Sequence, residues 1–107
     1  MKILLDECVT KRLKTYLRQH EVSTVTQKGW SGLKNGMLLQ NAVEDNFDLL
    51  LTIDKNILYQ RKVENYDIII VVFDTPSSSI DYVSKFIPRF TEMLQSFKKR
   101  NLYLISL

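Results

Sequence analysis

The run Leu49–Ile53, followed at once by Asp54, is the stretch that most restricts how this chain can fold. A short, mostly apolar run is typical of a strand buried on both faces of a parallel sheet. A carboxylate directly after such a strand faces the crevice in which open α/β sheets bind ligands. The same arrangement opens the chain, where Lys2–Leu5 leads into Asp6 and Glu7. Two strands that end in acids predict an α/β fold with a shared acidic site.

At 107 residues the chain is long enough for one domain with a single core. Its apolar share of 45% and charged share of 25% are those of an ordinary globular protein. No apolar run approaches the roughly 20 residues that span a bilayer, so we expect no membrane association. The single cysteine, Cys8, cannot form an internal disulfide, which favours a reducing cytoplasm. The net charge of +3 permits a polyanionic partner without requiring one.

Helical and strand patterns alternate along the rest of the chain. Apolar residues recur at helical spacing from Val9 to Leu17 with Thr10 as a candidate N-cap, and a β-branched strand follows. Pro88 predicts a kink or a late start in the last helix. The predicted elements after the first helix are a strand over Val22–Thr26, a helix over Met37–Asn46, a crossover helix over Asp54–Val63, a strand over Tyr66–Phe73, a long helix over Val83–Phe97 and a strand over Leu102–Leu107.

This alternation predicts an α/β three-layer sandwich with a mostly parallel five-stranded sheet, forming a single domain over residues 1–107. Right-handed crossovers and the strand order 2-1-3-4-5 would place the first and third strands side by side. Asp6 and Asp54 would then follow neighbouring strands and lie in one cleft.

The acids Asp6, Glu7 and Asp54 offer hard oxygen ligands, which suit Mg²⁺ or Mn²⁺ better than zinc. Such a site can activate water and neutralise charge that develops on a phosphodiester. Basic residues in the flanking segments are placed to guide a nucleic-acid backbone: Lys34, Lys55, Arg61 and Lys62. The chain has no glycine-rich phosphate loop, no HExxH motif and no Cys/His ligand set.

Simpler roles compete with these. Asp6, Asn35 and Asp54 each precede a helical pattern, where Asp and Asn often serve only as N-caps. For the two aspartates taken together with Glu7, a functional site is the favoured interpretation. Trp30 is expected to anchor its loop on the sheet rather than to stack on a base. Cys8 is expected to be a small buried apolar residue.

Three motifs together resemble a known family: Leu4-Leu5-Asp6-Glu7, then His20-Glu21-Val22 with Gly29-Trp30-Ser31-Gly32-Leu33-Lys34-Asn35-Gly36, then Leu51-Thr52-Ile53-Asp54-Lys55-Asn56. They are similar to small PIN-like proteins, namely the VapC-type toxins of bacterial toxin–antitoxin pairs and the Mut7-C nuclease-like domains. The resemblance runs from Met1 to about Lys62. It implies a PIN-like fold and a Mg²⁺-dependent ribonuclease with a small antitoxin as partner. The family's acids fall on Asp6, Glu7 and Asp54.

The chain departs from that pattern at Asn35 and Asn56, where many nuclease-type members have aspartate. One branch of the family carries similar LKNG and DKN sequences. An amide oxygen can still ligate Mg²⁺, but it brings no charge, so a metal held by Asp6, Asp54, Asn35 and Asn56 is expected to bind weakly. A PIN-like domain that binds an antitoxin or RNA without catalysis is therefore the main alternative. The sequence does not fix the oligomeric state, and a dimer is compatible with it.

A third interpretation is a phospho-accepting receiver domain, which the acid pair, Asp54 and Thr75 also resemble. Asp54 would accept the phosphoryl group, and Mg²⁺ would bind Asp6 and Glu7. A receiver places a lysine at the crevice end of its fifth strand, whereas Leu102–Leu107 contains none. This interpretation ranks well below the PIN-like one.

Overall fold

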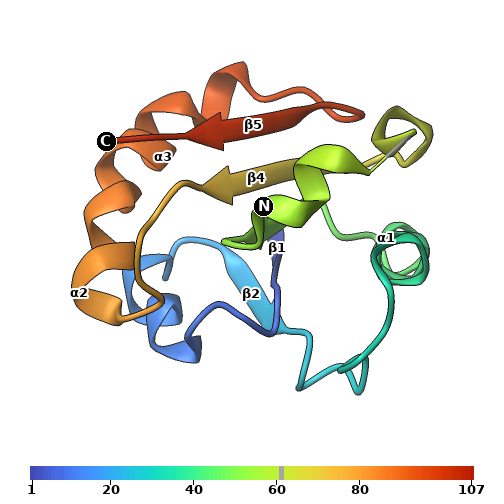
Figure 1. Ribbon diagram of the computed structural model, residues 1–107, viewed down its shortest axis with the longest axis horizontal. Coiled ribbons are helices and arrows are strands. Elements are labelled where there is room, and N and C mark those ends of the chain that lie inside the picture. The colour runs from blue at the N-terminus through green and yellow to red at the C-terminus, as the bar shows by residue number, and fades with distance from the viewer. Residues whose placement is uncertain (61) are drawn as a thin grey trace.

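The chain forms an α/β domain built on one five-stranded sheet, all of whose strands are parallel (Figure 1). This computed structural model describes residues 1–60 and 62–107. The strand order is β2-β1-β3-β4-β5, so the predicted order is confirmed. The strands are β1 (Lys2–Leu5), β2 (Glu21–Thr24), β3 (Leu49–Thr52), β4 (Ile69–Phe73) and β5 (Leu102–Ile105).

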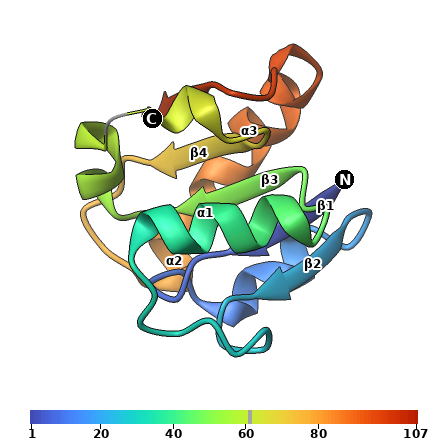
Figure 2. The ribbon, with the colours of Figure 1, turned by 90° about the vertical axis from the view of Figure 1, so that its right-hand side faces the viewer.

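Helices cover both faces of the sheet, with α1 on one side and α2 and α3 on the other (Figure 2). Most connections are 3₁₀ helices or very short α-helices. The helical segments are η1 (Lys11–Tyr16), α1 (Asn35–Glu44), η2 (Lys55–Tyr59), η3 (Val63–Asn65), α2 (Ile80–Val83), η4 (Ser84–Phe86), α3 (Ile87–Met93) and η5 (Leu94–Ser96). None of the described helices is both long enough and apolar enough to cross a membrane.

Alternation along the strands divides the core into two clusters, because successive side chains of a strand point to opposite faces. Leu49 and Leu51 of β3 pack on the face covered by η1, α2 and α3, whereas Leu50 packs on the face covered by α1. All three are fully buried. This two-sided burial is why β3 and β4 are apolar at nearly every position.

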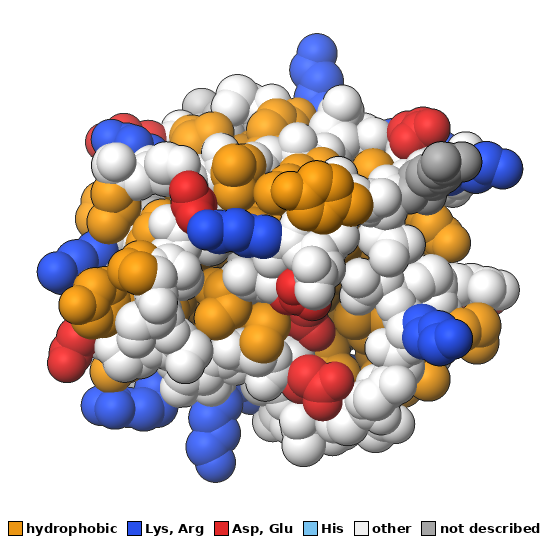
Figure 3. All heavy atoms as spheres, in the orientation of Figure 1, with side chains coloured by type: hydrophobic (Ala, Val, Ile, Leu, Met, Phe, Trp, Pro, Cys, Tyr) orange, Lys and Arg blue, Asp and Glu red, His pale blue; other side chains and the backbone are white. Residues whose placement is uncertain are grey.

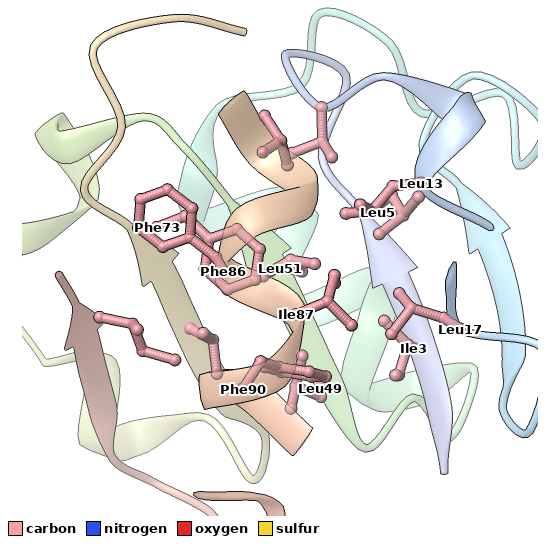
Figure 4. Packing of buried hydrophobic residues seen from close by; sticks show 14 of the residues in the cluster. Ile3, Leu5, Leu13, Leu17, Leu49, Leu51, Phe73, Phe86, Ile87 and Phe90 are labelled. Carbon is pink, nitrogen blue, oxygen red and sulfur yellow. The ribbon is translucent and has the colours of Figure 1, made fainter. Parts of the chain in front are cut away.

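Aromatic rings fill the larger cluster. The ring of Phe73 stacks on Phe86 with centroids 4.9 Å apart and meets Phe90 edge-on at 5.9 Å. Figure 4 shows these rings beside Ile87 and the β3 side chains. The arrangement fixes η4 and α3 against β4, the strand at whose carboxyl end Asp74 begins a loop.

Three helical regions differ from the sequence-based expectation. The first helix is a 3₁₀ helix whose N-cap is Thr10, as predicted. In the crossover predicted over Asp54–Val63, the described residues hold η2 and the first residue of η3. The long last helix is divided into α2, η4, α3 and η5, with Pro88 in the first turn of α3. Proline is tolerated there because its missing N–H would have no intrahelical acceptor.

Candidate functional site

Neighbouring strands bring Asp6 and Asp54 to the same edge of the sheet. β1 and β3 are paired with Leu5 opposite Leu51, and the pairing continues one residue further through the Asp6 N–H, which donates to the Leu51 carbonyl at 3.0 Å. Asp54 lies two residues beyond the last residue of β3. The sequence-based expectation that these two acids follow adjacent strands is therefore confirmed.

The hydroxyl of Thr52 links the two aspartates. Its Oγ1 donates to Asp6 Oδ2 at 2.7 Å and accepts the backbone N–H of Asp54 at 3.0 Å. Thr52 is fully buried and is one of two buried polar residues among those the structure describes. Sequence reasoning missed this residue. The available signal was a hydroxyl at the carboxyl end of an otherwise apolar strand, two positions before an aspartate.

Backbone amides hold both carboxylates in place. Asp54 is the N-cap of η2, and its Oδ1 accepts the Asn56 N–H at 2.9 Å. Asp6 Oδ1 accepts the Glu7 N–H at 2.9 Å, but Asp6 caps no helix, since Thr10 caps η1. The capping interpretation is thus correct for Asp54 and wrong for Asp6.

The side chain of Glu7 connects this edge to the glycine loop. Its Oε1 accepts the backbone N–H of Gly32 at 3.1 Å. Gly32 has φ +81°, in the left-handed region that glycine adopts without strain. One carboxylate oxygen of Glu7 therefore anchors the loop. The residue is exposed, so its carboxylate remains accessible to solvent.

Cys8 is exposed, so its expected role as a buried apolar residue is wrong. The turn after β1 directs its sulfur back to the carboxylates, with Sγ 3.4 Å from Thr52 Oγ1 and 3.8 Å from Asp6 Oδ2. Partial burial of the sulfur raises the pKa of the thiol. Hydrogen bonds to Thr52 and the Ile53 backbone oppose that rise, and the charges of Asp6 and Asp54 add to it. A raised pKa keeps the thiol protonated near neutral pH, which argues against a nucleophilic role.

The predicted basic residues are less concentrated than the acids. Lys55 forms an ion pair with Asp74, which also accepts a hydrogen bond from Ser106 Oγ at 3.4 Å. The Lys55 ammonium holds the pKa of Asp74 below its ordinary value. Lys34 is exposed and precedes α1. Arg61, also predicted to bind substrate, lies outside the described residues.

The two asparagines occupy different surroundings. Asn35 is the first residue of α1 and is partly buried, and Lys34 rather than Asn35 takes the N-cap position. Asn56 is exposed in the first turn of η2, where its backbone N–H contacts Asp54. Asn56 is therefore tied to the acidic site through its backbone. For Asn35 the structure gives a position in the chain but no contact with the acids.

A hollow of about 300 Å³ opens beside Asp6, between the carboxyl ends of β1 and β2. Glu7 also lines it, and the face seen in Figure 3 carries acidic side chains near its middle. A larger hollow of about 430 Å³ lies beside Trp30 and contains none of the predicted site residues. Trp30 packs edge-on against Phe47 at 6.1 Å, which agrees with its expected role as a loop anchor. We therefore place the candidate site at the carboxyl edge of β1 and β3, where the smaller hollow adjoins it through Asp6 and Glu7; Asp54 is not among the residues that line this hollow.

Comparison of the chain with known protein families, curated proteins and solved structures found no match. The chemistry of the site is therefore inferred from the positions of its own residues. Among the residues the structure describes, no group of three or more His, Cys, Asp or Glu side chains is placed to share a metal ion. Mg²⁺ usually keeps several waters and takes one or two carboxylates plus substrate phosphate. Asp6 and Asp54 supply two carboxylates, the number that this smaller requirement asks for, after neighbouring strands.

Replacing Thr52 with valine should destabilise the fold although valine is the better strand former. The change leaves the Asp54 N–H and one oxygen of Asp6 without their shared partner, at a cost of about 1–3 kcal/mol. Urea unfolding followed by circular dichroism measures the difference. Thr52→Ser is the control, since it keeps the hydroxyl and loses one buried methyl, about 1 kcal/mol. A Thr52→Val protein as stable as the wild type would show that the bridge contributes nothing.

Proposed function

We propose that this protein is a PIN-like, metal-dependent ribonuclease whose site is the carboxyl edge of β1 and β3. The observation that carries the proposal is the pair of acids that follow neighbouring strands, with the Thr52 hydroxyl hydrogen-bonded to the Asp6 carboxylate and to the backbone N–H of Asp54. The choice of RNA as substrate, and the toxin role with a small antitoxin, come from the sequence resemblance. The net charge of +3 is compatible with a polyanionic substrate.

In this proposal Asp6 and Asp54 hold Mg²⁺ or Mn²⁺. A bound ion of this kind would supply an activated water and neutralise charge on the phosphodiester. Thr52 orients the Asp6 carboxylate by donating to one of its oxygens, and the Asn56 N–H fixes Asp54. Glu7 assists from the rim while it holds the glycine loop. Lys34 is an exposed candidate for phosphate contact, whereas Lys55 must first leave Asp74.

A second candidate is a PIN-like domain that binds RNA or an antitoxin without cutting. Two observations favour it. The described residues hold no cluster of three metal-ligating acids, histidines or cysteines. Asn35 and Asn56, which replace the acids of many nuclease-type relatives, bring no negative charge to the site. Fewer charges weaken cation binding, so the two candidates differ in metal affinity more than in fold.

The test is a cleavage assay with purified protein, Mn²⁺ and a mixed pool of single-stranded RNA. We expect slow cleavage that stops when a chelator is added. The double variant Asn35→Asp with Asn56→Asp should cut faster, because two added charges strengthen cation binding.

Retention of RNA in a gel-shift assay without cleavage, in the wild type and in the double variant, would favour the binding candidate. Cleavage that persists in the chelator would point to a contaminating nuclease. Neither cleavage nor retention, in a protein with the circular dichroism spectrum of an α/β fold, would remove support from both candidates.

A further inference from the structure

The hollow beside Asp6 has a lining that suits a particular kind of ligand. The residues that line it include two that carry carboxylate acceptors, Asp6 and Glu7. Four others carry donors: Lys11 and the three threonines Thr10, Thr24 and Thr26. Together with the apolar Val9, these residues line one space of about 300 Å³, the lower end of the range for small-molecule sites.

Each threonine already accepts a hydrogen bond from the protein and so keeps its own hydrogen to donate. Thr10 Oγ1 accepts the Arg12 N–H at 3.3 Å, and Thr24 Oγ1 accepts the Gln27 N–H at 3.0 Å. Thr26 Oγ1 accepts from Ser31 Oγ at 3.4 Å. These bonds fix the oxygen atoms without using the hydroxyl hydrogens.

Thr24 is the most buried of the three threonines, at 8% exposed. Its Oγ1 accepts the Gln27 N–H, so its hydroxyl hydrogen remains able to donate to a ligand in the hollow that it lines. The turn that holds Thr24 is rigid, because its backbone N–H also donates to Gln27 Oε1 at 2.9 Å and Lys14 donates to the same oxygen at 2.6 Å.

The charges decide which ligand fits. A phosphate only accepts hydrogen bonds and would lie against two carboxylates with one lysine in the lining to offset them. A vicinal diol both donates and accepts at adjacent oxygens. It can donate to Asp6 or Glu7 while it accepts from threonine hydroxyls or Lys11. Carboxylates that accept from ribose hydroxyls are a known mode of sugar recognition.

We propose that this hollow binds the ribose of a nucleotide through its 2′- and 3′-hydroxyls and so distinguishes RNA from DNA. The inference rests on the proposed function for its place beside the cleavage site. It puts one sugar on the β2 side of Asp6, while the expected phosphate contacts of Lys34 and Lys55 stay as predicted from the sequence. The 2′-hydroxyl is the group by which proteins tell the two nucleic acids apart.

The experiment is a titration of isotope-labelled protein, in chelator, with adenosine 5′-monophosphate and with its 2′-deoxy analogue, followed by amide NMR shifts. We expect saturable shifts at Lys11 and Thr26. The ribonucleotide should bind at least about fivefold tighter, the ratio that corresponds to one hydrogen bond of about 1 kcal/mol. Inorganic phosphate alone should not shift these amides.

Variants separate this site from the general surface. Thr26→Val should bring the two affinities to within about twofold, and Thr26→Ser should keep the preference, because a single hydroxyl donor is lost in one and retained in the other. Thr91→Val, an exposed substitution in α3, is the matched control and should leave the preference intact.

Equal affinities for the two nucleotides, shifts with phosphate alone, or no saturable shift would each overturn the inference. Its failure can be told from failure of the ribonuclease proposal. A sugar preference in a wild-type protein that cuts no RNA in Mn²⁺ would support the hollow and reject the nuclease. Metal-dependent cleavage of RNA and DNA at equal rates would support the nuclease and reject the hollow as the group that distinguishes RNA from DNA.

Discussion

RNA cleavage is expected to fall by about a hundredfold or more in Asp54→Asn and in Asp6→Asn. Each change removes one of the two charges assigned to the metal, and metal-ion stabilisation of a developing charge is worth several kcal/mol, at about 1.4 kcal/mol for each tenfold in rate. The measurement is the initial rate of cleavage of a defined single-stranded RNA in Mn²⁺, with wild type and variants purified in parallel.

The free energy of unfolding should be nearly unchanged in Asp54→Asn, so a loss of cleavage in this variant can be assigned to the site rather than to unfolding. Asp54 caps η2 through one oxygen, and asparagine caps a helix about as well as aspartate. Asp6→Asn must also accommodate the Thr52 hydroxyl and should cost about 1 kcal/mol of stability. Equal cleavage rates in all three proteins would mean that the activity does not arise at this site.

Phe73→Ala is expected to lower the free energy of unfolding by about 3–5 kcal/mol. The ring is fully buried and contacts both Phe86 and Phe90, so its removal leaves a cavity and breaks two aromatic contacts. The total free energy of unfolding of a natural domain is only about 5–15 kcal/mol, so the variant would be partly unfolded at modest urea concentrations. Chemical denaturation followed by circular dichroism measures the change.

Tyr59→Ala is the matched control, because it removes an aromatic ring that is 82% exposed. Its stability should stay within about 0.5 kcal/mol of the wild type. A small loss in Phe73→Ala, comparable with that of the control, would contradict the packing of η4 and α3 on β4.

The strand order was predictable because each strand carries its own signal. The apolar run of β3 and the still more apolar β4 require burial on both faces, which only central strands of a parallel sheet receive. Right-handed crossovers then leave few arrangements, and the predicted order places β1 beside β3. The common edge of Asp6 and Asp54 follows from that pairing.

The helices and the details of the site were less accessible. Over six residues, the apolar spacing of η1 does not separate 3.0 from 3.6 residues per turn, so its 3₁₀ form could not be read from the pattern. The role of Thr52 depends on the register between β1 and β3, which brings its hydroxyl to Asp6. The exposure of Cys8 depends on a turn in which the Val9 N–H donates to the Asp6 carbonyl. A pattern of apolar and polar residues records burial, and it carries no information on strand register or on the hydrogen bonds of a turn.

Whether Asp6 and Asp54 form one cation site is tested by the broadening of amide NMR signals by substoichiometric Mn²⁺. We expect that the amides of residues 6–8 and 54–56 lose intensity first, that those of α3 do not, and that Asp54→Asn abolishes the pattern. Loss centred elsewhere, for example around Glu44 and Asp45, or a pattern that survives Asp54→Asn, would contradict it.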